Sequence, residues 1–279
     1  MVYEGSWHGA GLVLAGIVTA LSMVALMRRL IPREVLRQGH DATGNMLSIV
    51  GTLYAVLLGL IVVDAMVRFE RAIDGVQGES NCLADIFLLS GRFPEPHRSR
   101  LAESCRAYAQ EVVDVEWPLM RQAKMSVEAR KAALTITRAL ETFEPMTEGE
   151  KVVFPMVLEQ MRELWNLRRD RANAVEYGIP AIEWVALLIG AGVTLLFAGL
   201  FSVDRAGLQY LLTALSALVI GLNLHLVSLF GYPFAGELSV SKRPFLLDIG
   251  LFEGKFDAEP AHPSEMLGRP RGKLSLIHI

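Results

Sequence analysis

Five polar side chains stand within otherwise apolar stretches of the sequence, where they could bind or conduct ions. They are Tyr54, Asp64, Glu183, Asn223 and His225. A polar group inside a membrane span is costly to place in hydrocarbon, so such groups tend to line an ion pathway or to contact a partner. Each of the five is therefore a candidate for a role in permeation.

Each candidate also has a structural interpretation. Asp64 precedes Arg68 by one helical turn, so the two side chains can form an ion pair at the membrane boundary. Glu183 is followed by a tryptophan, a pair typical of the membrane interface, where a charge reaches water. Asn223 and His225 can form hydrogen bonds to neighbouring helices. Both interpretations stay open at this point.

The rest of the sequence gives little support for catalysis or cofactor binding. It contains no Gly-rich phosphate-binding loop, no histidine pair at metal-ligand spacing and no serine in a nucleophile-elbow sequence. Its 2 cysteines, Cys82 and Cys105, indicate buried thiols rather than a disulfide or a zinc site. A net charge of -3 disfavours nucleic acid as a partner. We expect a protein that is not an enzyme and has no cofactor or metal.

The elements that position the polar residues are membrane spans. Of the 279 residues, 52% are hydrophobic and 20% charged, and the mean hydropathy is +0.36. About 20 apolar residues of helix cross a bilayer core of about 30 Å. Four stretches reach that length, at residues 9–27, 46–67, 182–203 and 208–230. We predict an all-α integral membrane protein whose spans form two hairpins, over residues 1–67 and 181–230, in contact with the lipid bilayer.

Between the hairpins, residues 68–180 are charged and have apolar residues at helical spacing, which predicts a helical soluble domain. The second span is expected to continue into this domain as one helix, to about Gly91. Two Pro-Phe pairs over residues 231–260 predict an extended segment. We expect residues 261–279 to form a tail. The final residues 274–279 match a translated sequencing adapter, so we expect them to be an artefact.

Basic residues near the span ends predict the orientation, because cytoplasmic loops carry an excess of Lys and Arg. One side of the membrane has Arg28, Arg29, Arg33, Arg37 and Arg205, and the other has Arg68, Arg71, Arg168, Arg169, Arg171, Lys242 and Arg243. The second set is larger, which favours a bacterial inner-membrane protein with the 68–180 domain and both termini in the cytoplasm.

Several short runs carry a family resemblance. They are residues 51–60, Arg68-Phe69-Glu70, Glu79-Ser80-Asn81, Tyr108-Ala109, Glu116-Trp117-Pro118, Pro233-Phe234 with Gly236-Glu237, and Pro244-Phe245. Together they resemble bacterial bestrophin-like membrane proteins, a group classed as a domain of unknown function and distantly similar to bestrophin anion channels. Bestrophins are pentamers in which the second transmembrane helix of each subunit lines the pore.

The resemblance implies which residues form the narrow neck of such a pore. With Gly59 and the later Arg-Phe pair as the register, the neck positions are Thr52, Val56 and Leu60. The neck is less bulky than in bestrophins, and Asp64 occupies a stretch where an acid repels anions. The resemblance thus implies a homo-oligomeric ion channel that is pentameric and conducts anions. The smaller neck and Asp64 are the two respects in which this sequence departs from bestrophins.

The second span also offers a surface for helix packing. Gly51, Ala55 and Gly59 recur at four-residue steps, and small residues let helices approach closely.

A channel needs a ring of subunits around an axis. The alternative is a non-conducting membrane scaffold or sensor whose helical domain binds a protein partner. The stoichiometry of the purified protein distinguishes the two functions.

Overall fold

The structure is a computed structural model that describes residues 7–201, 203, 205–236 and 238–255. The expected tail over residues 261–279, with the suspected adapter residues 274–279, lies outside the described residues. The described residues form two compact units. The membrane unit contains the residues up to Arg68 together with Ile179–Gly231, and the bundle unit contains Phe69–Gly178 and the residues from Tyr232 onward.

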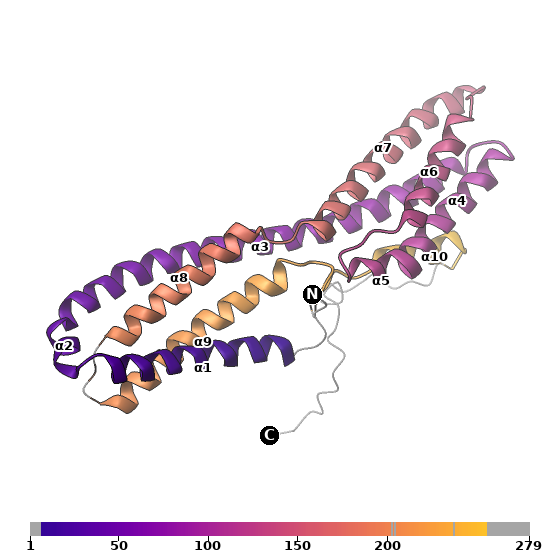
Figure 1. Cartoon of the computed structure of the whole chain (residues 1–279). Helices are drawn as coiled ribbons and strands as arrows, with labels where there is room; N and C mark the ends of the chain where they lie inside the picture. The colour runs from indigo at the N-terminus through magenta and orange to yellow at the C-terminus, as the bar shows by residue number, and fades with distance from the viewer. Residues whose placement is uncertain (1–6, 202, 204, 237, 256–279) are drawn as a thin grey trace, which may run out of the picture. The chain divides into compact units, whose positions relative to one another are not determined.

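The membrane unit is built from long apolar helices. The described residues contain four helices with the length and composition to cross a membrane, which confirms the expected number of spans. In Figure 1, α1 lies beside α9, and α8 and α9 form a hairpin. The helices of this unit are α1 (Trp7–Leu30), the short α2 (Arg33–Gln38), the first part of α3 (His40–Ser90), α8 (Ala181–Leu200) and α9 (Ala206–Phe230).

One face of α3 forms the core of the membrane unit. Tyr54, Leu58, Ile61 and Ala65 are buried there against residues of α8 and α9. Gly190 of α8 permits this packing, because a Cβ atom at that position would lie 2.4 Å from Cδ2 of Tyr54. Residues three and four apart share one side of a helix, so this spacing commits one side of α3 to contacts within the chain.

The bundle unit consists of helices whose apolar stripes face inward, including Leu101, Cys105 and Tyr108 of α4. Two of its helices begin at local caps: Ser126 accepts a hydrogen bond from the backbone of Ala129, and Thr147 forms a capping box with Glu150. The helices are the second part of α3, α4 (His97–Glu111), the π-helical η1 (Val112–Glu116), α5 (Trp117–Met120), α6 (Val127–Glu141), α7 (Glu148–Glu176) and α10 (Arg243–Phe252).

The structure differs from the sequence-based expectation for residues 231–260. That segment was expected to be extended, but it contains the helix α10. Pro244 lies in the first turn of α10, where its missing N–H group costs no hydrogen bond. The backbone N–H of Arg243 donates to the Ser241 hydroxyl oxygen at 3.2 Å, which satisfies a free donor at the helix start.

Candidate functional site

The predicted neck residues lie on the side of α3 that faces away from its packed side. Thr52 and Val56 are each two residues from the buried Tyr54, which places them about 160° around the helix from it. The side chains of Val56 and Leu60 are 58% and 66% exposed, and Thr52 is also exposed. The Thr52 hydroxyl donates to the backbone oxygen of Ser48 at 2.8 Å, so its hydrogen bond is satisfied within α3.

The small residues of α3 also lie outside the packed core. A Cβ atom at Gly51 or at Gly59 would have no described heavy atom of another residue within 4 Å, beyond the helix backbone itself. Ala55, between them, is exposed. Within the described chain, this small-residue surface is therefore open to a close approach by another helix.

Three of the predicted polar residues come together at the boundary of the membrane unit. The Arg68 Nε atom lies 2.6 Å from Oδ2 of Asp64, in the expected ion pair. A terminal guanidinium nitrogen of Arg68 lies 4.0 Å from Oε1 of Glu183, at the start of α8. The other carboxylate oxygen of Glu183 is buried and has no hydrogen-bond partner among the described residues. Arg68 thus lies between two acids from different helices.

The other polar candidates lie at separate places. The Tyr54 hydroxyl is buried without a hydrogen-bond partner among the described residues. The Asn223 side chain donates to the backbone oxygen of Val219 at 2.9 Å, which is a bond within its own helix. His225 packs on α1, where a Cβ atom at Gly9 would lie 2.1 Å from the imidazole Cε1. These three residues do not share one site.

A polar contact that the sequence analysis missed joins α1 to the α8–α9 turn. Arg28 donates to the side-chain oxygen of Gln209. Gln209 is 3% exposed, and its amide nitrogen donates to the backbone oxygens of Gly199 at 2.8 Å and Phe201 at 3.2 Å. The carbonyl groups at the end of α8 are thereby satisfied. A glutamine in the first turn of an apolar span is the signal that could have indicated this contact.

The bundle unit contains a network of buried charges. Arg171 of α7 binds Glu79 of α3 with two hydrogen bonds, of 2.7 and 2.8 Å. Arg168 binds Glu116 of η1 with two hydrogen bonds of 2.7 Å, and Arg171 also lies 2.8 Å from Glu116. All four residues are at most 4% exposed. The network balances two positive charges with two negative charges, as buried ion pairs require.

Neighbouring groups complete this network. The Tyr108 hydroxyl donates to Glu79 and accepts a hydrogen bond from Arg168 at 3.0 Å. The backbone N–H of Ser126 donates to Glu116 at 3.1 Å. Burial alone raises the pKa of Glu116, but the charges of Arg171 and Arg168 outweigh it and hold that pKa below its usual value. The Glu116 carboxylate therefore stays ionised and joins η1 to α7.

One expectation changes with this geometry. Arg168 and Arg171, assigned above to the membrane flank, are buried in ion pairs of the bundle unit instead. Glu79, Tyr108 and Glu116, which carried part of the family resemblance, meet in this one network. Among the described residues, no group of three or more His, Cys, Asp or Glu side chains is arranged to hold a metal ion. The network joins α3, α4, η1 and α7 within the bundle unit.

Comparisons with known proteins agree on the fold. The model of the bestrophin-like domain matches residues 14–245. No curated protein matches the chain. A crystal structure of a bacterial bestrophin homologue from Klebsiella pneumoniae is similar, with a TM-score of 0.65 and 11% identity, covering 89% of this chain and 100% of that one. A single-substitution variant of that homologue gives a TM-score of 0.63 and 13% identity, covering 91% and 97%.

Proposed function

The chain belongs to the bestrophin-like family, whose model matches residues 14–245, and we propose that it forms a homo-oligomeric ion channel with α3 lining the pore. The observation that carries the proposal is the uncovered side of α3. Thr52, Val56 and Leu60 are exposed there, opposite the side that packs within the chain. An apolar constriction of this kind can gate ion flow by dewetting.

A ring of subunits supplies what one chain lacks. A chain with four spans has few helices with which to enclose a water-filled path alone. The open surface at Gly51, Ala55 and Gly59 suits close contact between α3 helices of neighbouring subunits. We take the ring to be a pentamer with closed cyclic symmetry, from the resemblance to bestrophins.

The charges of α3 favour cations over anions, in contrast to the anion channel that the resemblance implied. Beyond the neck, the exposed acids of α3 outnumber its bases, even when Arg68 and Asp64 are set aside as a pair. In a ring, each charge is repeated once per subunit, so the excess of acids attracts cations and repels anions. The acids are Asp64, Glu70, Asp74 and Asp85, and the bases are Arg68 and Arg71.

We assign the protein to the bacterial inner membrane, with the bundle unit and both termini in the cytoplasm. Cysteine labelling tests this orientation, because Cys82 and Cys105 are buried and give a low background. Met146 of the bundle unit is 80% exposed, and Leu30 at the end of α1 is 71% exposed. An impermeant maleimide should label Leu30→Cys, and not Met146→Cys, on intact spheroplasts. The opposite pattern reverses the orientation.

The mass of the assembly is the first test of the channel. In nanodiscs, native mass measurement should give a ring of several subunits. A monomer alone contradicts both the ring and the channel, and leaves the scaffold or sensor as the better function.

The neck is tested by truncation to alanine in reconstituted liposomes. A variant with Thr52, Val56 and Leu60 all changed to Ala should widen and hydrate the constriction, and raise ion flux. The matched control truncates three exposed aliphatic residues of α8, and should leave flux at the wild-type value. If the neck variant assembles but its flux stays at the level of empty liposomes, the neck assignment is wrong. The control residues are Val185, Leu188 and Ile189.

Selectivity is measured as the reversal potential in a KCl gradient. The wild-type potential should lie towards the K⁺ equilibrium value, and Glu70→Gln, Asp74→Asn and Asp85→Asn together should move it towards zero. Three exposed glutamates elsewhere in the bundle unit provide a control of equal charge change, which should leave the potential unchanged. A wild-type potential near the Cl⁻ value contradicts the cation preference without contradicting the channel. The control residues are Glu141, Glu144 and Glu148.

A further inference from the structure

Helix α10 carries a buried acid between two aromatic anchors. Phe245 and Phe252 are 0% and 4% exposed, and Phe252 packs on Phe87 of α3 with ring centroids 4.5 Å apart. Asp248 lies between them in the sequence and is 7% exposed. The Ser80 hydroxyl of α3 donates to Oδ2 of Asp248 at 2.6 Å. One hydrogen bond thus joins the middle of α10 to α3.

The basic groups near Asp248 hold other partners, although the buried Nε of Arg106 has none among the described residues. On α7, Arg171 binds Glu79 and Glu116, and on α4, Arg106 donates to the backbone oxygen of Phe252 at 2.5 Å. Lys242, just before α10, donates to the backbone oxygen of Val113 at 3.3 Å. Among the described residues, the hydrogen bond that the structure shows for the Asp248 carboxylate comes from Ser80.

The remaining titratable groups around Asp248 are acids, a thiol and one further arginine. The Cys105 thiol of α4 is buried, and its pKa is raised by burial and by the negative charge of Asp248. On α3, Glu79 faces the network, and on η1, Asp114 is exposed. On α10 itself, Arg243 lies at the helix start. Just after α10, Glu253 binds Lys255 at 2.7 Å.

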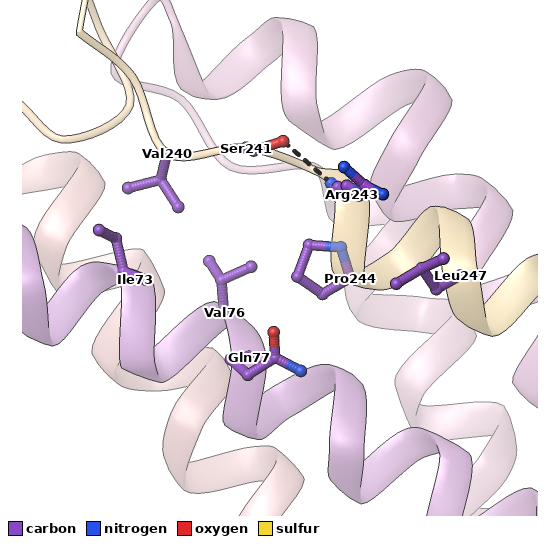
Figure 2. A pocket seen from close by; sticks show the side chains of 8 residues that line it. All are labelled: Ile73, Val76, Gln77, Val240, Ser241, Arg243, Pro244 and Leu247. Carbon is purple, nitrogen blue, oxygen red and sulfur yellow. Dashed lines mark hydrogen bonds between the residues drawn. The ribbon is translucent and has the colours of Figure 1, made fainter. Parts of the chain in front are cut away.

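The packing under the start of α10 is incomplete. Figure 2 shows a small pocket between α3 and the first turns of α10, lined mainly by apolar side chains. Cavities of this kind remove part of the contact that would hold two helices together. The first turns of α10 can therefore separate from α3 at a lower cost than a fully packed helix. The pocket is lined by Ile73, Val76, Gln77, Val240, Ser241, Arg243, Pro244 and Leu247.

Burial raises the pKa of Asp248 to about 7, and the hydrogen bond from Ser80 only partly opposes that shift. An ionised carboxylate buried with one hydrogen bond is unfavourable, whereas the neutral carboxyl group is not. The usual pKa of this side chain is 3.8. Because the docked pKa is the higher one, docking of α10 is most favourable below pH about 4 and weakens as the pH rises to about 7.

We propose that Asp248 is a proton-dependent latch, which holds α10 on α3 when its carboxyl group is neutral and releases the helix when it is ionised. The latch is a property of the bundle unit and does not depend on ion conduction. Because α3 also carries Thr52, Val56 and Leu60, the latch offers a route from pH to the pore; this last step rests on the proposed function.

Hydrogen–deuterium exchange of the full chain in nanodiscs tests the latch directly. Exchange rates of α10 peptides are measured at pH 6 and pH 8 and corrected for the intrinsic pH dependence of amide exchange. The pKa of Asp248 is 3.8 when α10 is undocked and about 7 when it is docked. Linkage then gives about a tenfold increase in the opening equilibrium from pH 6 to pH 8. Equal corrected rates at pH 6 and pH 8 overturn the proposal, whether or not the protein conducts ions.

Two variants assign the effect to this carboxyl group. Asp248→Asn keeps a neutral side chain at both pH values, so its α10 peptides should lose the tenfold change and stay protected. Asp114→Asn removes an exposed acid from η1, and should retain the tenfold change. A tenfold change that persists in Asp248→Asn also overturns the proposal. If Asp248→Asn does not fold, the wild-type rates alone decide.

Discussion

Replacing Arg171 with alanine tests whether buried charges hold the bundle unit together. The Arg171 side chain is 2% exposed and lies within 2.8 Å of carboxylate oxygens of both Glu79 and Glu116. The variant leaves Glu79, which is fully buried, without its bidentate partner. Removing one member of a buried ion pair costs about 3–5 kcal/mol, because the remaining charge is uncompensated. We expect that loss in the free energy of unfolding of the bundle unit.

Thermal unfolding in detergent measures the loss. For a unit of this size, about 1 kcal/mol corresponds to about 3 °C in Tm, so Arg171→Ala should unfold about 10 °C or more below the wild type. Arg169→Ala is the matched control, because its guanidinium group is exposed and bonds only Asn166 of the same helix among the described residues. Exposed positions of this kind change stability by about 0.5 kcal/mol or less. Equal unfolding temperatures for the two variants refute the reasoning.

A double variant separates the ion pair from simple loss of packing. Arg171→Met with Glu79→Gln removes both charges and keeps most of the side-chain volume. Replacing a buried ion pair with neutral groups is often close to neutral for stability, so the double variant should unfold above Arg171→Met, which keeps the same volume but leaves Glu79 without its bidentate partner. A double variant that unfolds at the same temperature as Arg171→Met shows that the unpaired charge does not account for the loss.

Two further predictions concern the membrane unit. Gly190→Ala should destabilise this unit by about 1–3 kcal/mol, because the new methyl group overlaps the Tyr54 ring that packs there from α3. Gly192→Ala is the control and should be neutral, since its Cβ would meet nothing within 4 Å. Equal Tm values for the two variants contradict this packing. Exchanging the charges of Asp64 and Arg68 should lower stability by about 0.5–1 kcal/mol, because the new acid at position 68 faces Glu183, and adding Glu183→Gln should restore it. An exchange that leaves the Tm unchanged shows that the contact with Glu183 has no energetic role.

The spans could be predicted because hydropathy is a property of composition over a whole helix. Residues 9–27, 46–67, 182–203 and 208–230 each lie almost entirely within a helix of the structure. The helix α10 could not be predicted in the same way. Its Pro-Phe pair is typical of extended chain, and the helix is stabilised by Phe245 and Phe252 packing on residues more than 100 positions earlier in the sequence. Tertiary contact decides such short helices.

The buried network was also beyond the sequence analysis, because an ion pair between Glu79 and Arg171 joins residues 92 positions apart. A local signal was nevertheless present. Arg168 and Arg171 continue the apolar stripe of α7 at three- and four-residue steps after Leu164, and both are buried. An arginine on the inward stripe of an amphipathic helix indicates a buried partner more strongly than a membrane flank.

The family resemblance and the proposed ion path depend on different residues. Inside the bundle unit, Glu79 and Glu116 pair with Arg171 and Arg168, and Tyr108 donates to Glu79, so folding constrains the identities of these residues. Val56 and Leu60 contact little within the chain, so packing inside one subunit does not constrain them. The same fold can therefore support necks of different size and charge. It follows that ion selectivity has to be measured on the uncovered side of α3 and does not follow from membership in the family.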